Sequence, residues 1–326
     1  MPTQSILLHR IPRYLSKSAT LLQPCLVVRA KQPHRAKRGV HSSSMSYTFG
    51  STEYRAAKGT HTATVIYLHG LGSSGSDIAQ LVDGGALRAG DHIKYVFPNA
   101  PQRPVTLNMG AVMPAWFDLP MLGPDMYSKI DWAGHNAAMA HLNKLIEEET
   151  KAGIPTERIV VGGFSQGGNV AVRGALAHPE KLAGVLINST FLGPPLQDPQ
   201  TPLTPTPANK NINALWCHGQ ADPMVPMQVS QMDSQVLKNV GVSLQWLTYP
   251  GLTHSLNPDV IRDMTAFLMK HIPASGSAAP AAAAVTAEDV SGMSVKELKV
   301  FITSKGGNPA TCFEKSELVS LANTLI

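Results

Sequence analysis

The chain has 326 residues, of which 43% are hydrophobic and 15% are charged. This length and composition exclude a disordered chain and allow one large domain or two smaller ones. The net charge of +5 is unevenly distributed, because residues 1–52 hold eight Lys or Arg and no Asp or Glu, while the rest carries 19 basic and 22 acidic residues. The positive charge therefore belongs to the N-terminal segment, and nucleic-acid binding by the globular part is not expected.

The three cysteines, Cys25, Cys217 and Cys312, are too few and too scattered for a disulfide framework. None has the spacing of a metal site, so we expect a reducing compartment, no metal and no cofactor. No apolar run approaches the ~20 residues of a membrane-spanning helix, so any contact with lipid would be peripheral.

Residues 1–44 are expected to be a targeting peptide. Their apolar and basic side chains fall on separate sides of a helical projection, and acidic residues are absent. Arg38 shortly before Ser42–Ser44 is typical of mitochondrial processing, which predicts a mitochondrial location. Met45 offers a second start, so a cytoplasmic form is the alternative, and a disordered basic tail is another.

From Thr62 onward, short apolar runs alternate with longer helical patterns, which is typical of a parallel sheet with crossover helices. The predicted strands are Ala63–Leu68, Ile93–Phe97, Arg158–Gly163, Ala183–Asn188, Asn213–Cys217 and Ser243–Tyr249. The predicted helices are Asp77–Arg88, Trp132–Ala152, Gly167–His178, Gln228–Val240 and Pro258–His271. The pattern predicts an α/β fold with a mostly parallel sheet and helices on both faces.

The central motif is Gly163-Phe164-Ser165-Gln166-Gly167, which has the form G-x-S-x-G. A β-branched strand precedes it and a helical run follows it, as a nucleophile elbow requires. Glycines are needed there because the turn is strained and crowded. The motif predicts an exposed nucleophile at Ser165, with a glycine-rich turn of no catalytic role as the alternative.

Three other loops at strand ends supply the groups that such a nucleophile needs. The loop His69–Gly75 presents backbone N–H groups, and Leu71 is the candidate oxyanion donor. Its alternative use, phosphate binding, is disfavoured because the Walker lysine is missing. Asp222 and His254 each follow a predicted strand, and the order Ser165, Asp222, His254 is that of the α/β-hydrolase fold. Asp222 would orient His254, which would act as the general base, although an Asx-turn would also explain Asp222.

Two further histidines, His69 and His218, are expected to support these loops.

A long segment, Asn99–Leu119, is rich in Pro, Met and aromatic residues and is expected to be an irregular wall for a flexible acyl chain. The alternative is a loop held by a few core contacts. The residues expected to contact substrate are Leu107, Met109, Met113, Trp116 and Phe117.

Residues from about Thr62 to Ile272 resemble the acyl-protein thioesterase and lysophospholipase family, also called phospholipase/carboxylesterase, of the α/β-hydrolase superfamily. The resemblance rests on HGLG at 69–72, PVTLNM at 104–109, PAWFD at 114–118, GFSQGG at 163–168, CHG at 217–219, DPMVP at 222–226 and YPG at 249–251 before His254. It implies a Ser165, Asp222 and His254 triad, and oxyanion donors from the backbone of Leu71 and Gln166. It also implies a hydrophobic acyl channel near Trp116.

The C-terminal part has a pattern of its own. Residues 273–285 are almost entirely Ala, Pro, Ser and Gly and are expected to form a linker between a domain at 45–272 and a module at 286–326. Ser294 and Glu297 have capping-box spacing at the start of a helix, and a second helix is expected at Ser316–Ile326. The apolar face of the first helix is predicted to contain Val295, Leu298, Phe301 and Ile302. The module resembles SAP-like helical modules and is expected to dock a protein or to stabilise the chain.

Together these observations predict a serine hydrolase of fatty acyl thioesters and esters. S-acylated proteins are the first expected substrates, which would make the reaction depalmitoylation, followed by lysophospholipids and small esters. All need the same triad and channel, so these alternatives stay open. An alternative from another class is an inert hydrolase fold that recruits a partner through its C-terminal helices.

Overall fold

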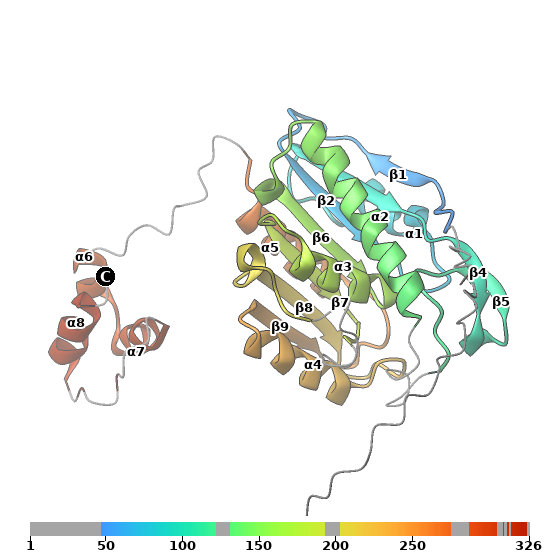
Figure 1. The fold of residues 1–326 in the computed structure, drawn as a ribbon. Coiled ribbons are helices and arrows are strands. Elements are labelled where there is room, and N and C mark those ends of the chain that lie inside the picture. The colour runs from blue at the N-terminus through green and yellow to red at the C-terminus, as the bar shows by residue number, and fades with distance from the viewer. Residues whose placement is uncertain are drawn as a thin grey trace, which may run out of the picture. The chain divides into compact units, whose positions relative to one another are not determined.

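The computed structural model of the chain describes residues 47–121, 131–192, 203–274, 287–304, 309, 312 and 314–324. The expectations for residues 1–44, for most of the linker and for the last two residues of the C-terminal helix, 325 and 326, lie outside these ranges. Between residues 47 and 274 the chain forms a seven-stranded sheet in the order β1-β3-β2-β6-β7-β8-β9 (Figure 1). The edge strand β1 pairs with β3 in the antiparallel sense, and the other pairings in this sheet are parallel.

The strands of this sheet are β1 (Thr52–Arg55), β2 (Ala63–Leu68), β3 (Ile93–Pro98), β6 (Ile159–Phe164), β7 (Gly184–Asn188), β8 (Asn213–Gly219) and β9 (Ser243–Tyr249). The helices that pack on it are α1 (Gly75–Asp83), α2 (Trp132–Lys151), α3 (Gln166–Ala177), α4 (Met227–Asn239) and α5 (Pro258–His271). The alternation of strands and helices seen in the sequence is therefore confirmed.

Helices cover both faces of the sheet, so its central strands are apolar on both sides. In β2, Ile66 and Leu68 belong to the core under α2, α3 and α4, whereas Val65 and Tyr67 belong to the core under α1 and α5 (Figure 1). This arrangement follows from the period-2 alternation of side chains along a strand, and it explains why β2 is a continuous apolar run.

Helix α1 is shorter than predicted. The sequence predicted a helix to Arg88, but α1 ends at Asp83, because Gly84 and Gly85 follow it and Gly85 has a positive φ of 73°. The N–H groups of both glycines return to carbonyl groups of the last turn, which is typical of a glycine-terminated helix.

The sequence analysis predicted an irregular segment at Asn99–Leu119, but this segment contains regular structure. Strands β4 (Gln102–Val105) and β5 (Ala111–Pro114) form a two-stranded antiparallel sheet, and a short 3₁₀ turn (Thr106–Asn108) precedes Gly110 in its connection. These strands contain Pro104 and Pro114, and prolines are compatible with strands that have a free edge. Strand β1 was also missed, because only four residues form it and their side chains are mostly half-buried.

The C-terminal residues form three helices of their own: α6 (Ala287–Gly292), α7 (Val295–Ser304) and α8 (Lys315–Asn323). The backbone N–H and side chain of Ser294 bond with the side chain and N–H of Glu297, which confirms the predicted capping box. Leu298 and Ile302 are fully buried as predicted, but Val295 is 43% exposed, so its assignment to the apolar face is wrong. The core of the module is completed by Val290, Leu318 and Ala322.

Candidate active site

Ser165 lies at the sharp turn between β6 and α3. Its φ of 51° and ψ of −120° are unusual for a residue with a side chain, a conformation that costs about 1–3 kcal/mol. A Cβ at Gly163 would overlap the backbone of Gly167, and one at Gly167 would overlap the carbonyl group of His69. The strain is held in place because the Ser165 N–H donates to the Asn188 carbonyl oxygen at 2.9 Å.

Asp222 uses its two carboxylate oxygens for different purposes. Oδ1 accepts the N–H groups of Met224 and Val225 at 2.9 Å each, which is the Asx-type turn that the sequence offered as an alternative. Oδ2 lies 2.7 Å from Nδ1 of His254. Both explanations of this aspartate are therefore correct, and the turn aims the carboxylate at the imidazole.

The carboxylate of Asp222 is completely buried, whereas 19% of the His254 side chain is exposed. Burial raises the pKa of an aspartate, but the His254 ring and the N–H groups of Val225 and Met224 outweigh it and hold the pKa of Asp222 below its usual value. An ionised carboxylate only accepts hydrogen bonds, so Nδ1 of His254 carries the proton. Nε2 is then left as the proton acceptor.

The loops that carry Asp222 and His254 are joined to each other. The Gln220 N–H donates to the Tyr249 carbonyl oxygen and the Ala221 N–H donates to the Leu252 carbonyl oxygen, both at 3.0 Å. In addition, the ring of Phe164, the residue before Ser165, packs against the His254 ring with 4.8 Å between ring centroids. The acid and the base are thus fixed relative to each other and to the elbow.

The two candidate oxyanion donors come from different loops beside Ser165. Gln166 is the first residue of α3, so its backbone N–H has no acceptor within the helix. Leu71 lies in the loop after β2, where the Gly72 N–H donates to the Pro114 carbonyl oxygen at 2.8 Å. Both residues line the same cavity as Ser165 and His254.

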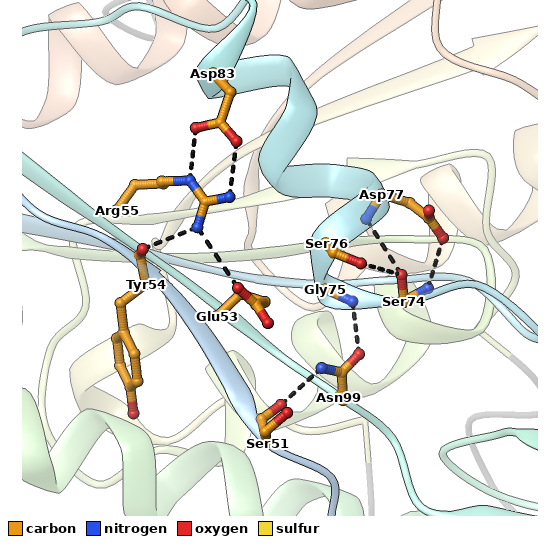
Figure 2. Close-up of polar contacts among 10 residues, drawn as sticks. All are labelled: Ser51, Glu53, Tyr54, Arg55, Ser74, Gly75, Ser76, Asp77, Asp83 and Asn99. Atoms are coloured by element: carbon orange, nitrogen blue, oxygen red, sulfur yellow. Dashed lines mark hydrogen bonds and ion pairs between the residues drawn. The ribbon is translucent and has the colours of Figure 1, made fainter.

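Figure 2 shows how the end of the Leu71 loop is fixed to α1. Asp77 accepts hydrogen bonds from the Ser73 hydroxyl and the Ser74 N–H, which lower its pKa. The Gly75 N–H donates to Oδ1 of Asn99 at 2.7 Å, and the Asn99 amide donates at 2.7 Å to a carbonyl group just before β1. The loop therefore enters α1 through a network of side-chain and backbone bonds.

His69 and His218 support these loops, as predicted. His69 accepts the Ala100 N–H at Nε2, and its Nδ1 is hydrogen-bonded to the Gly70 carbonyl oxygen. Nε2 of His218 is hydrogen-bonded to the Val225 carbonyl oxygen at 2.9 Å. Burial lowers the pKa of both rings, so they are neutral in the folded protein. Neither ring lines the cavity around Ser165.

A cavity of about 600 Å³ lies over Ser165 and His254. Leu107 and Met113 line it, as predicted. The sequence analysis did not identify several other apolar residues of its wall, which are Ile78, Leu81, Leu119, Phe191, Met224 and Leu256. The position of Phe191 just after β7 was a usable signal, because ligand-binding residues gather at the carboxyl ends of parallel strands.

Three residues that were predicted to contact substrate do not line this cavity. Met109 is 99% exposed on the β4–β5 connection, and Trp116 and Phe117 are completely buried behind the cavity. Trp116 donates its indole N–H to the His69 carbonyl oxygen and its backbone N–H to the Gln166 side chain, both at 2.8 Å. The Gln166 amide in turn donates to the Phe117 carbonyl oxygen at 2.8 Å. These aromatic residues therefore position the elbow and its neighbouring loop.

Two other searches concern the described part of the chain only. Within it, no three His, Cys, Asp or Glu side chains come together as metal ligands. Among the same residues, no helix combines the length and the apolar content needed to cross a bilayer.

Comparisons with known proteins identify the family to which this part of the chain belongs. The sequence profile of the phospholipase/carboxylesterase family matches residues 51–272. Acyl-protein thioesterase 1 of Gibberella zeae is 39% identical over 223 residues, which are 67% of this chain and 94% of that protein. The protein of the same name from Mycosarcoma maydis is 41% identical over 228 residues, covering 65% and 92% of the two chains.

Solved structures show the same fold. Acyl-protein thioesterase 2 of Zea mays superposes with a TM-score of 0.58 at 29% identity, covering 68% of this chain and 99% of the other. SOBER1 of Arabidopsis thaliana gives the same TM-score and identity over 65% and 99% of the two chains. The chain belongs, through residues 51–272, to the phospholipase/carboxylesterase family of α/β hydrolases.

Proposed function

We propose that this serine hydrolase cleaves the fatty acyl thioesters of S-acylated proteins, and so acts as a depalmitoylating enzyme. The observation that carries the proposal is the pairing of a strained Ser165 with His254, which is bonded to the buried Asp222, under an apolar cavity. The names of the relatives, acyl-protein thioesterase 1 and 2, support the thioester as substrate.

In the first half of the reaction, Oγ of Ser165 attacks the acyl carbonyl carbon while Nε2 of His254 takes the hydroxyl proton. The carbonyl oxygen gains negative charge, which the N–H groups of Leu71 and Gln166 stabilise by about 3 kcal/mol per donor. The C–S bond then breaks, and His254 returns the proton to the leaving thiolate. Asp222 holds the ring in the required tautomer and stabilises its charged form.

In the second half, water attacks the acyl-serine ester. His254 takes a proton from this water and gives it to Ser165 Oγ as the acyl-oxygen bond breaks. The products are a free fatty acid and the restored serine. The apolar walls of the cavity, including Leu107, Met113 and Phe191, would hold the acyl chain in both halves.

The proposal is tested with matched substrates that carry the same hexadecanoyl chain. These are an S-acylated peptide, a lysophospholipid and a small ester. We expect the highest kcat/KM for the peptide thioester, and no turnover of any substrate by Ser165→Ala. A chain that cleaves the lysophospholipid faster than the thioester would instead be a lysophospholipase, and one that cleaves none of them would be an inert adaptor.

Peripheral membrane contact is the second part of the proposal. Met109 and Val112, in the connection and second strand of the β4–β5 hairpin, are 99% and 66% exposed. Leu107 and Met113 of the same hairpin line the catalytic cavity. An acylated substrate is anchored in lipid, so apolar side chains beside the cavity would bring the enzyme to the surface that holds its substrate.

We also propose that the C-terminal module docks a partner protein and takes no part in turnover. Its five core residues are supplied by α6, α7 and α8 themselves, while Val295 stays exposed. Deletion from Pro273 onward should leave kcat/KM on a small thioester within about twofold of the full chain and change the co-purifying proteins. A loss of turnover would assign the module to the active site.

For the location we propose mitochondria, with a cytoplasmic form that begins at Met45. The mitochondrial part rests on the basic, acid-free sequence of residues 1–44. The shorter form is supported by contacts just beyond Met45, where the Phe49 ring stacks on His141 at 4.0 Å between centroids and the Tyr47 ring lies 5.3 Å from the Arg103 guanidinium. A chain that begins at Met45 therefore keeps these contacts. Fluorescent fusions of the two forms should separate, and identical cytoplasmic patterns would refute the targeting role.

A further inference from the structure

A second apolar cavity lies beside the catalytic one. It has a volume of about 630 Å³ and lies between the end of α1 and the outer face of α5. Leu81 and Leu256 line both cavities, so the two cavities are adjacent and meet at these two side chains. The apolar surface of the second cavity also includes Ala86, Ile261, Ala266 and Met269.

The position of this second cavity relative to His254 indicates which part of a substrate would reach it. His254 returns a proton to the leaving thiolate, so the leaving group must lie next to its ring. Leu256 is two residues beyond His254 and is the point at which the two cavities meet. The second cavity is therefore on the leaving-group side. Leu107 and Phe191 line only the catalytic cavity and are available to the acyl chain.

The chemistry of the second cavity fits a peptide better than a lysophospholipid headgroup. Its polar lining residues are Asn257, Thr265 and Arg262, and the Arg262 guanidinium is already paired with Asp259 at 2.5 Å and Asp263 at 3.3 Å. A phosphate group would have to compete with these carboxylates. A mainly apolar surface with a few polar side chains is typical of a protein-binding surface.

Met269 adds to this argument because it is 57% exposed on the wall of the cavity. Methionine side chains adapt to differently shaped apolar partners, which suits a surface that meets many sequences. We propose that this second cavity binds apolar residues adjacent to the acylated cysteine of the protein substrate. The inference rests on the proposed thioesterase function and names the part of the substrate that selects proteins over lipids.

The test uses three thioesters with one acyl chain. The first is a peptide with Leu and Phe beside the S-acyl cysteine, the second has Ser and Asn at these positions, and the third is a small thiol ester. Wild-type enzyme should cleave the first with about a tenfold higher kcat/KM than the other two, since each well-buried apolar side chain contributes about 1.4 kcal/mol or more.

Two variants place a charge in the cavity without touching the core, because Ala266 and Met269 are both exposed on α5. Ala266→Glu and Met269→Glu should each lower kcat/KM for the apolar peptide by about fivefold to tenfold and leave the other two substrates within about twofold. The matched control is Met232→Glu, which makes the same change at a 71% exposed methionine on α4 that lines neither cavity.

Two results would overturn the proposal. One is equal cleavage of the two peptides by wild-type enzyme, and the other is an equal loss on all three thioesters in the α5 variants. Failure of wild-type enzyme to cleave any of the three would instead overturn the thioesterase function itself.

Discussion

The side-chain amide of Gln166 offers a measurable test of how the elbow is held. Its Oε1 accepts the Trp116 N–H and its Nε2 donates to the Phe117 carbonyl oxygen, each at 2.8 Å. Trp116 and Phe117 are at most 1% exposed, so water cannot replace either bond. Gln166→Leu leaves two buried backbone groups without a partner at about 1–3 kcal/mol each, so unfolding should become easier by roughly 2–6 kcal/mol.

The assay is urea denaturation followed by tryptophan fluorescence. All four tryptophans lie between residues 116 and 246, so the signal reports the hydrolase domain. Gln220→Leu is the matched control, because the Gln220 amide makes only an exposed bond to Thr248. We expect the control to lose less than about 0.5 kcal/mol. If the two variants were equally stable, the amide of Gln166 would not hold the aromatic segment and our reasoning would be refuted.

Three further predictions concern the acid, a buried carboxyl group and the hairpin. Asp222→Asn keeps an oxygen for the loop N–H groups but disturbs the imidazole tautomer, so kcat should fall by about 10⁴-fold in a chromogenic thioester assay, and a loss below tenfold would contradict its role. Burial raises the pKa of Asp233 to about 6, against the opposing effects of the Leu192 N–H and Arg173. The free energy of unfolding should therefore fall by roughly 3 kcal/mol as the pH rises from below 4 through 6, because the buried group then loses its proton. Asp233→Asn should remove this fall, and the measurement compares the free energy of unfolding at pH 4 and pH 7. Met109→Ser with Val112→Ser should lower co-sedimentation with vesicles at least about tenfold and leave turnover of a soluble thioester unchanged, whereas unchanged vesicle binding would exclude the hairpin.

The residues of the candidate triad could be chosen from the sequence because each follows an apolar strand in a parallel sheet. Ser165, Asp222 and His254 are far apart in sequence, but the carboxyl ends of parallel strands meet at one edge, and the strands were readable from their apolar runs. The order of the strands and the 2.7 Å contact between acid and base were not readable, because both depend on how the crossover helices pack.

The residues that line the catalytic cavity were predicted less well, since local sequence does not tell whether an apolar side chain faces a cavity or the core. Trp116 has the composition of a ligand contact, but its indole N–H is used by a backbone carbonyl and its ring is buried. Leu81 and Leu256 gave no signal, because an apolar residue on a helix or after a catalytic loop is equally suited to the core. The β4–β5 hairpin around Met109 was not predicted, because prolines are rare in strands except at a free edge.

The central claim is that Ser165 is the nucleophile, and covalent labelling tests it most directly. The full chain is treated with a fluorophosphonate, digested, and the modified residue is located by mass spectrometry. Our account predicts a single adduct on Ser165, its loss in Ser165→Ala, and its strong slowing in His254→Ala. An adduct on another residue, or labelling of Ser165→Ala at the wild-type rate, would contradict the account.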